Sequence, residues 1–311
     1  MISVIVIGKD EGERLTRCFE SLQVIHYLKH ELIYVDSGSV DDSVQRALAA
    51  NASVYLLSET HPTPGLGRRI GASQAKGEWL LFLDGDMRLQ KGFVEKALNI
   101  VYEKKAEAVA GIRDDEYIAG NTIHSQIQNY FNCTCERNCP EFGGALFISA
   151  EVLKSCGGWS GDTIACEEAE LHARLNSENH PVLEIPVPMI IHSDTVRDNR
   201  SALSILFSMR RLGEGQAFRC AMANHHAKAY VQRESVKFGF YLLDWLTVLF
   251  LFLPYGIGLL SLSLFQCFQL GYYFSKKKLR SFIGQKLFFF AFPLGLLTYK
   301  KRSEAFKEVK V

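Results

Sequence analysis

The hydrophobic positions of the first hundred residues follow two alternating periodicities. Continuous apolar runs, typical of buried parallel strands, occur at residues 4–7, 32–35, 54–57 and 79–83. Apolar residues recur at helical spacing within residues 15–22, 42–50, 70–75 and 93–101. This alternation predicts an α/β fold in which a mostly parallel sheet is flanked by helices. Ligands of such sheets bind beyond the carboxyl ends of the strands.

The pattern changes twice further along the chain. Beyond residue 110 it is less regular, and we expect strands at 145–148 and 182–185 and a helix at 167–176. Past residue 237 the composition changes sharply, to long apolar segments with Lys and Arg clustered between and after them. The predicted organisation is therefore one α/β domain at 1–200, connecting and interfacial helices at 201–236, and membrane-associated helices at 237–311.

The apolar region begins with residues 238–274, which carry a single charged side chain, Asp244. A proline and two glycines divide this run into 238–253 and 256–274, each near the length of about 20 residues that spans a bilayer. Lys and Arg flank both ends, so the positive-inside rule predicts a helical hairpin with both ends in the cytosol. A third apolar segment, 282–299, could span the membrane, re-enter it or lie in its interface. The alternative for the region is a pair of buried core helices.

Charge and cysteine content narrow the class of protein. Lys and Arg total 35 and Asp and Glu total 34, a balance that does not fit a general nucleic-acid binder. The 8 cysteines are scattered and no signal-peptide pattern opens the chain, which predicts a cytosolic domain with reduced thiols. Cys133, Cys135 and Cys139 could bind zinc with a fourth ligand. Their spacing matches no common zinc motif, so reduced cysteines in a loop are the favoured interpretation.

An acidic turn, Asp84-Gly85-Asp86, directly follows the buried run at 79–83. Two carboxylates one residue apart can face a single cation, and Mg²⁺ or Mn²⁺ prefers carboxylates combined with phosphate oxygens. Gly85 leaves room for a diphosphate to approach. The alternative is a surface turn in which Asp86 caps the following helix. Asp36 ends another strand of the same predicted sheet, so Asp36 and Asp84 can face one crevice.

Other polar residues near predicted strand ends suit a bound nucleotide. Asp36 begins a Ser/Gly turn that includes Ser39, and its carboxylate can accept hydrogen bonds from a base or from ribose hydroxyls. The alternative is an ordinary turn that only begins the next helix. Arg68 and Arg69 suit phosphate, although they could instead be solvated arginines in a flexible loop.

Two further candidates lie later in the chain. Glu167 and Glu168 begin a predicted helix, where either could serve as a general base. On residue types alone, first-turn acids favoured by the helix dipole are the better interpretation. His192 follows an apparent strand and could be a distal metal ligand, but a lone histidine is more often structural.

Taken in order, these segments resemble the inverting family-2 glycosyltransferases of the GT-A fold. The likeness covers residues 1 to about 195. It rests on the opening strand with Asp10-Glu11, on VDSGSVDDS, on Arg68-Arg69-Ile70-Gly71, on LFLDGDM, and on GGW followed by EEAEL. Each motif alone is only moderately specific, but five of them in the order of the family are specific for it.

The resemblance implies a role for each matching residue. Nucleotide-sugar binding would fall to Asp10, Glu11, Asp36, Ser39, Arg68, Arg69, Asp84 and Gly85, and metal binding to Asp86, Asp84 and His192. The catalytic base would be Glu168 or Glu167, because the chain reads Glu-Glu where the family has Glu-Asp. The QxxRW motif of processive members is absent, and residues 210–216 are not equivalent to it, which favours transfer of a single sugar.

The resemblance and the apolar region together predict an activity. A UDP-linked nucleotide sugar would lose its sugar, with inversion, to a hydroxyl of a lipid-linked glycan acceptor, and Mn²⁺ or Mg²⁺ and the arginines would stabilise the departing diphosphate. The enzyme would work at the cytoplasmic face of a membrane, which we take as the bacterial inner membrane. Two alternatives are a polyprenyl-phosphate glycosyltransferase and a non-catalytic sugar-binding membrane scaffold. A metal-dependent nucleotidyltransferase lacks a basic phosphate-binding signature at the start of the chain.

Overall fold

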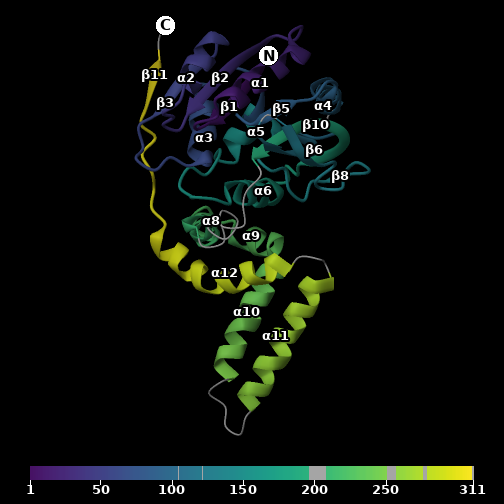
Figure 1. Cartoon of the computed structure of the whole chain (residues 1–311), viewed down its shortest axis with the longest axis vertical. Coiled ribbons are helices and arrows are strands. Elements are labelled where there is room, and N and C mark those ends of the chain that lie inside the picture. Colours follow the sequence, from purple (N-terminus) through teal and green to yellow (C-terminus); the bar gives the residue numbers. More distant parts are fainter. Residues whose placement is uncertain (104, 121, 196–207, 251–256, 276–278, 310–311) are drawn as a thin grey trace. The chain divides into compact units, whose positions relative to one another are not determined.

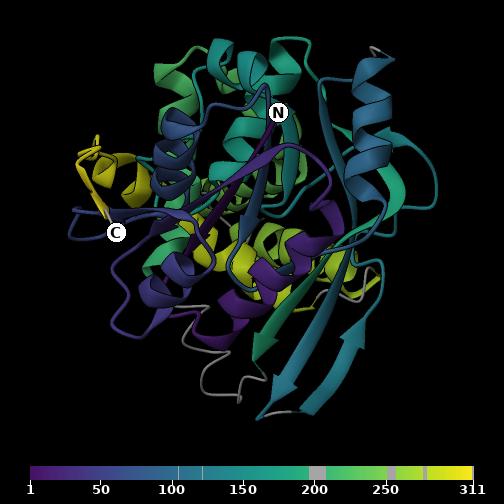
Figure 2. The same cartoon turned by 90° about the horizontal axis from the view of Figure 1, so that it is seen from above.

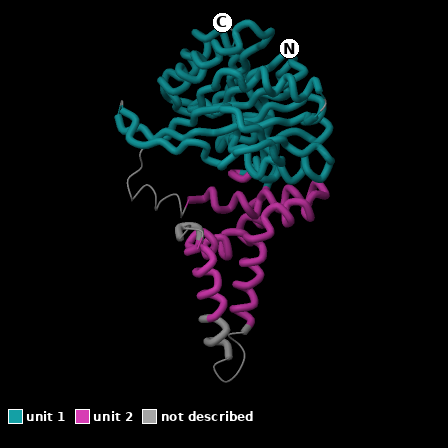
Figure 3. Tube along the Cα trace, turned by 90° about the vertical axis from the view of Figure 1, so that its right-hand side faces the viewer, with its two compact units in different colours: residues 1–163, 167–197, 300–311 teal, residues 164–166, 198–299 magenta. Residues whose placement is uncertain are grey.

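The computed structural model describes residues 1–103, 105–120, 122–195, 208–250, 257–275 and 279–309. The chain divides into two compact units, distinguished by colour in Figure 3. Unit 1 comprises residues 1–163, 167–197 and 300–311, and unit 2 comprises 164–166 and 198–299. The predicted boundary at residue 200 lies outside the described residues. Residues 300–311, however, belong to unit 1 and not with the helices that precede them in the chain.

Unit 1 is built on one sheet, labelled in Figure 1, which has 11 strands within the described residues. The strands are β1 (Ile2–Gly8), β2 (His30–Asp36), β3 (Ser53–Leu57), β4 (Trp79–Asp84), β5 (Met87–Leu89), β6 (Ala108–Ala119), β7 (Thr122–Ile127), β8 (Arg137–Asn138), β9 (Leu146–Ser149), β10 (Leu183–Thr195) and β11 (Phe306–Val309). The helices are α1 (Glu13–Ser21), the short 3₁₀ helix η1 (Leu22–Ile25), α2 (Ser43–Ala49), α3 (Pro64–Gln74), α4 (Phe93–Tyr102), α5 (Ala150–Ser155) and α6 (Glu167–Ser177).

The sheet is mixed, which corrects the expectation of a mostly parallel one. Its order is β11-β3-β2-β1-β4-β9-β6-β10-β5, with β7 beside β6 and β8 beside β10. The four strands predicted from the first hundred residues pair in parallel as expected. Strand β9 runs antiparallel between β4 and β6, and β5 and β11 are also antiparallel to their neighbours.

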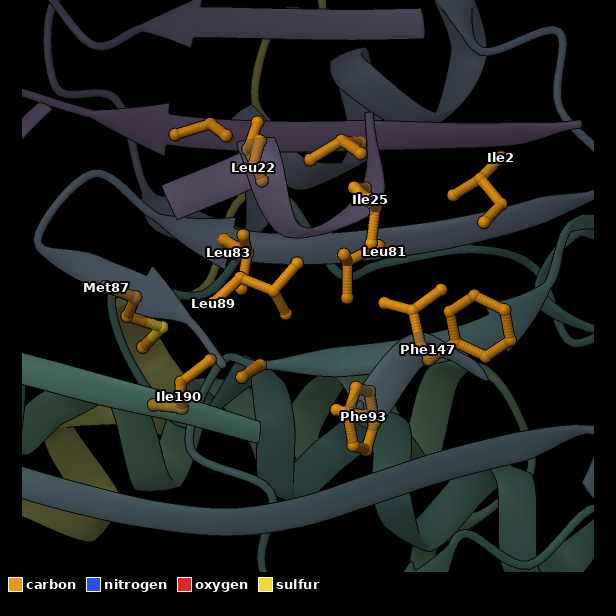
Figure 4. Packing of buried hydrophobic residues seen from close by; sticks show 14 of the residues in the cluster. Ile2, Leu22, Ile25, Leu81, Leu83, Met87, Leu89, Phe93, Phe147 and Ile190 are labelled. Atoms are coloured by element: carbon orange, nitrogen blue, oxygen red, sulfur yellow. The ribbon is translucent and has the colours of Figure 1, made fainter. Parts of the chain in front are cut away.

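Hydrophobic side chains cover both faces of the sheet. Along β1, Val4 and Val6 belong to one core cluster, while Ile5 and Ile7 belong to the other. Figure 4 shows part of the first cluster, which includes Phe147 of β9 and Phe93 of α4. Because both faces are buried, the strands read as continuous apolar runs rather than as alternating ones.

The register of the sheet brings the ends of three strands together. Gly8 of β1 lies opposite Asp36 of β2, and Ile7 of β1 lies opposite Asp84 of β4. The two carboxylates therefore end neighbouring strands at the same edge, as the sequence predicts. Figure 2 views the sheet from above.

Unit 2 is helical in its described parts. Its helices are η2 (Met209–Leu212), α8 (Gly213–Ala223), α9 (Ala227–Arg233), α10 (Ser235–Phe250), α11 (Ile257–Ser275) and α12 (Leu279–Thr298). Among the described residues, no helix combines the length and the apolar character that crossing a membrane requires. The hairpin predicted at 238–274 also runs through residues 251–256, which lie outside the described ranges.

Asp244, the single charge of that apolar run, is buried within unit 2. Gln266 and Gln269 of α11 donate to Asp244 Oδ1 at 3.2 and 2.9 Å, and Lys286 of α12 pairs with the same carboxylate. A buried charge requires such partners, because an unpaired one would be costly. The cluster therefore ties three helices of this unit together.

Candidate active site

The turn that follows β2 is organised around Asp36, which is buried. Asp36 Oδ2 accepts hydrogen bonds from the backbone N–H groups of Gly38 and Ser39 at 2.9 and 2.8 Å, and Oδ1 accepts one from the Ser39 hydroxyl at 2.5 Å. Ser39 Oγ in turn accepts a hydrogen bond from the backbone N–H of Asp10 at 2.9 Å, and Asp10 accepts one from Val40 at 2.7 Å. Asp10, Asp36 and Ser39 thus join the loops after β1 and β2 into one rim.

Glu11 lies between this rim and the acidic turn. The side chain of Arg14 approaches its Oε2 to 2.8 Å. Burial and then the charge of Asp86 raise the pKa of Glu11 to about 7, although Arg14 acts in the opposite direction. An acid so close to other carboxylates marks this part of the site as one that attracts cations.

Arg68 is the buried centre of the site. Its guanidinium donates to Asp84 Oδ1 at 2.8 Å and to Glu167 Oε1 at 2.9 Å, and it stacks over the Trp159 ring at 4.8 Å from the ring centre. Helix α3 begins at Pro64, six residues before the predicted start, because the Thr63 side chain caps it by accepting from the backbone N–H of Leu66. Arg68 therefore lies inside a helix, and the alternative of a solvated arginine in a flexible loop is wrong for it.

Arg69, its neighbour, points to a different set of partners. Its Nε donates to the Trp159 carbonyl at 2.7 Å, and its Nη1 donates to Glu304 Oε1 at 2.7 Å. The structure therefore does not bring Arg69 together with the carboxylates that surround Arg68.

The acidic turn itself leaves little room around Gly85 and Gly144. The Gly85 N–H donates to the Ile7 carbonyl at 2.8 Å, and a Cβ at Gly85 would lie 2.8 Å from Glu11 Cγ. A Cβ at Gly144, whose φ is +87°, would lie 2.6 Å from Arg68 Nη2 and 2.9 Å from Asp84 Oδ2. Burial raises the pKa of Asp84, while Arg68 opposes this change. Both positions require glycine, because a Cβ would collide with the side chain of Glu11 at Gly85 and with those of Arg68 and Asp84 at Gly144.

Asp86 faces His192 from across the edge of the sheet. Asp86 Oδ2 lies 3.4 Å from His192 Nε2, and His192 Nδ1 lies 3.3 Å from Asp115 and 2.9 Å from Arg113. Burial lowers the pKa of His192, but hydrogen bonds to Asp115 and Asp86 outweigh burial and raise it to about 9. The other Asp86 oxygen, Oδ1, is buried with no hydrogen-bond partner among the described residues.

Asp86 and His192 fit a divalent cation in part. They offer an oxygen and a nitrogen side by side, and the unpartnered Oδ1 of Asp86 is a buried polar atom that a cation would satisfy. Asp84, the third predicted ligand, has its Oδ1 paired with Arg68. In the described part of the chain, no group of three or more His, Cys, Asp or Glu side chains is arranged to hold a metal.

The three cysteines considered as zinc ligands, Cys133, Cys135 and Cys139, likewise form no such metal-binding group among the described residues. Cys133 and Cys139 are buried and Cys135 is exposed, and all three are free thiols. Burial raises the pKa of Cys139 to about 12, which keeps its thiol protonated.

The first turn of α6 separates the two candidate bases. Glu167 is buried, with Oε1 bound to Arg68 and Oε2 without a hydrogen-bond partner among the described residues. Burial and the Glu168 charge raise the pKa of Glu167, and Arg68 opposes them. The side chain of Glu168 is 28% exposed and lies 3.6 Å from Arg68 Nη1. Both carboxylates thus lie beside Arg68, and Glu168 is the more exposed of the two.

Sequence reasoning missed Arg113 and Asp115, which surround His192. Arg113 Nε donates to Asp115 Oδ1 at 2.6 Å, and both residues lie on β6, a strand that the hydrophobic pattern did not predict. Charged residues within a partly buried strand were the available signal, because buried charges require partners.

Comparison with known proteins identifies the family of this chain. Residues 3–159 match the family described as Glycosyl transferase family 2. The chain belongs to that family. It is 28% identical over 169 residues to the glycosyltransferase GlyG of Streptococcus pneumoniae serotype 4, covering 53% of each chain. It is 22% identical over 174 residues to the glycosyltransferase AglE of Haloferax volcanii, covering 53% of this chain and 57% of AglE. The chain thus matches only about half the length of these curated relatives.

Solved structures share the fold. Residues 1–349 of S. aureus TarS, in complex with UDP-GlcNAc, superpose with a TM-score of 0.56 at 16% identity, over 92% of this chain and 90% of that TarS chain. GalNAc-T7 with UDP, GalNAc and Mn²⁺ superposes with a TM-score of 0.52 at 15% identity, over 64% of this chain and 44% of that protein. The predicted GT-A-like α/β fold is therefore confirmed, with a mixed sheet.

Proposed function

We propose that this protein transfers a single sugar from a UDP-linked nucleotide sugar to a hydroxyl group of a lipid-linked glycan, with inversion at the sugar. The observation that carries the proposal is the position of Arg68, buried between Asp84 on the predicted donor side and Glu167 on the predicted base side. The buried Arg68 guanidinium links the part of the site proposed to hold the sugar donor with the part proposed to hold the catalytic base. Family membership and the UDP-GlcNAc bound to TarS support the class of donor.

The nucleotide is proposed to lie along the rim formed by Asp10, Asp36 and Ser39. This rim follows the carboxyl ends of β1 and β2, where α/β sheets bind nucleotides. Its hydrogen bonds fix the loops before a ligand arrives, which lowers the entropic cost of binding.

Mn²⁺ or Mg²⁺ is proposed to be held by Asp86 and His192, with the Asp84 carboxylate nearby. When bound, the cation would neutralise charge on the diphosphate. Gly85 and Gly144 let Glu11 and Arg68 pack closely beside Asp84, which keeps these charged side chains next to the proposed diphosphate position.

Glu168 is proposed as the base and Glu167 as the residue that positions Arg68. Glu168 accepts the proton of the acceptor hydroxyl while that oxygen bonds to the sugar carbon, and the bond between the sugar and the diphosphate breaks. The electron pair leaves with UDP. Arg68, oriented by Glu167 and Asp84, places positive charge on the departing side.

Attachment to a membrane, at the cytoplasmic face of the bacterial inner membrane, is part of the proposal. The described helices of unit 2 expose large apolar side chains, among them Leu249, Phe268, Phe274, Phe290 and Leu297. Monomeric soluble proteins rarely expose so many on one group of helices. Such a surface suits an acceptor that is itself anchored in lipid.

The proposal is tested with the purified chain, Mn²⁺ and a panel of UDP-sugars with a prenyl-linked glycan acceptor. We expect transfer from one donor and a product of inverted configuration. Glu168→Gln should lower kcat by about 10²- to 10⁴-fold, because the variant cannot take the proton. Glu151→Gln, an exposed acid on α5, serves as the matched control and should keep full activity.

Two outcomes would contradict the proposal. No transfer from any nucleotide sugar would exclude the activity. Full activity of Glu168→Gln would favour the polyprenyl-phosphate glycosyltransferase, whose phosphate acceptor needs no strong base.

A further inference from the structure

Residues 300–309, which we call the strap, return to unit 1 after helix α12. Within the strap, β11 pairs antiparallel with β3, from Phe306 opposite Leu57 to Val309 opposite Val54. The Ser58 N–H donates to the Ala305 carbonyl at 3.0 Å. The strap therefore closes an edge of the sheet that would otherwise be unpaired.

The strap also makes polar contacts before β11 begins. The backbone N–H of Arg302 donates to Asp162 Oδ1 at 2.8 Å, and its guanidinium donates to the His61 carbonyl. Glu304 accepts a hydrogen bond from Arg69 at 2.7 Å, and Arg69 also donates to the Trp159 carbonyl. These contacts are more specific than covering a sheet edge requires.

The contacted segments are those that lead to the central residues of the site. Residues 58–63 run into α3, which carries Arg68, and residues 159–162 precede Glu167 by a few positions. The two segments touch closely. Thr63 Oγ1 donates to the Gly161 carbonyl at 2.9 Å, and a Cβ at Gly65 would lie 2.0 Å from the Ser160 carbonyl oxygen.

We propose that the strap positions the catalytic segments, with Arg302 and Glu304 as positioning residues for Arg68 and for the base on α6. Arg302 holds the two segments together from outside through His61 and Asp162. Glu304 orients Arg69, which fixes the carbonyl of Trp159, the residue whose ring packs on Arg68. Small displacements of reacting groups are costly in catalysis, so this geometry bears on turnover.

The strap pairs with β3, whereas the rim around Asp36 that is proposed to hold the nucleotide follows β1 and β2. Loss of the strap contacts should therefore lower kcat and leave nucleotide affinity nearly unchanged. This inference rests on the proposed roles of Arg68 and Glu168.

The experiment uses the full chain with the double substitution Arg302→Ala and Glu304→Ala, which removes the side-chain contacts to His61 and Arg69. The backbone bond from residue 302 to Asp162 and the pairing of β11 stay in place. The matched control is Lys307→Ala with Glu308→Ala, which alters two exposed side chains of β11 itself. We expect the first variant to lose about tenfold in kcat, with the Kd for UDP within about twofold of the unaltered chain. Arg302→Lys with Glu304 intact should recover most of the turnover.

Hydrogen exchange provides a readout that does not depend on activity. In the Arg302/Glu304 variant, amides of residues 159–168 should exchange faster, while those of residues 34–43 should not change. Unchanged exchange at 159–168 would overturn the proposal, as would a kcat loss equal to that of the control. If the unaltered chain transfers no sugar but exchange responds as expected, the proposed function fails and the positioning by the strap stands.

Discussion

Arg68 illustrates how one buried side chain organises this site. A guanidinium is always charged, so its burial requires partners, and its planar donors can serve two carboxylates at once. Asp84 and Glu167 provide them from a strand and a helix that are far apart in the sequence. A lysine would offer a compact point charge in place of this planar fork, and it would lose the stacking on Trp159. The geometry of the site thus depends on this arginine more than on any single acid.

His192 allows a test of the proposed metal site through pH. Its raised pKa of about 9 means that the folded protein holds a proton on the imidazole at neutral pH, and a metal ligand must be neutral. Mn²⁺ affinity should therefore increase between pH 6.5 and 8, by up to about tenfold per pH unit. Isothermal titration of the full chain with Mn²⁺ measures this dependence.

Two variants separate the contributions of the metal-site residues. His192→Gln should flatten the pH dependence, and Asp86→Asn should weaken Mn²⁺ binding at every pH. The same slope in His192→Gln and in the unaltered chain would show that another group controls the titration.

Part of the site could be read from the sequence, and part could not. Asp36, Asp84 and Asp86 follow apolar runs, so strand periodicity alone placed them at one sheet edge. The separation of Glu167 from Glu168 was not predictable, because it depends on which oxygen meets Arg68. The difference between Arg68 and Arg69 was also not predictable, since the partner of Arg69 comes from residue 304.

Helix α3 was also predicted only in part from the sequence. Apolar spacing predicted a short helix from residue 70, but glycines obscured the first turn, which begins at Pro64. These glycines are explained by packing and not by flexibility. A Cβ at Gly71 would lie 2.4 Å from a methyl group of Ile5, and at Gly65 it would meet the backbone of Ser160.

Substitution of Gly65 tests this explanation. Alanine favours a helix by about 1 kcal/mol over glycine. The close approach to the Ser160 carbonyl oxygen should outweigh that gain, so Gly65→Ala is expected to lower the free energy of unfolding by about 1–3 kcal/mol. Urea denaturation measures the change.

Gly239 provides the control, since it is also helical and a Cβ there would meet nothing within 4 Å. Gly239→Ala should be neutral or slightly stabilising. A stabilising effect of Gly65→Ala would contradict the close approach of α3 to the Ser160 carbonyl oxygen.

The strands that escaped prediction share a physical cause. The apolar runs at β1 to β4 reflect burial on both faces, which the sequence records directly. Strand β6 instead mixes buried and half-buried charges, and β11 is a short, mostly exposed strand at an edge. Pairing with β10 and β3 determines them, and such long-range pairing leaves little local signal.

The whole molecule combines an α/β unit with a helical unit of different surface character. In unit 2, exposed apolar side chains gather on α10, α11 and α12 around an internal Asp244–Lys286 pair. We expect the full chain to bind vesicles of phosphatidylethanolamine and phosphatidylglycerol. The triple substitution Phe268→Ser, Phe274→Ser and Phe290→Ser should lower the partition coefficient more than about tenfold, because burying one such side chain is worth about 1.5–3 kcal/mol.

A matched control tests whether vesicle binding depends on the exposed side chains of unit 2 or on any exposed aromatic side chain of the protein. Tyr102→Ser removes an equally exposed aromatic ring from α4 of unit 1 and should leave vesicle binding unchanged. Flotation of each variant with the vesicles measures the bound fraction. If the triple variant floats as well as the unaltered chain, the exposed aromatic side chains have another role and the lipid-linked acceptor loses its main support. If binding falls and transfer to a detergent-solubilised acceptor persists, the helical unit brings the enzyme to its substrate without taking part in the chemistry.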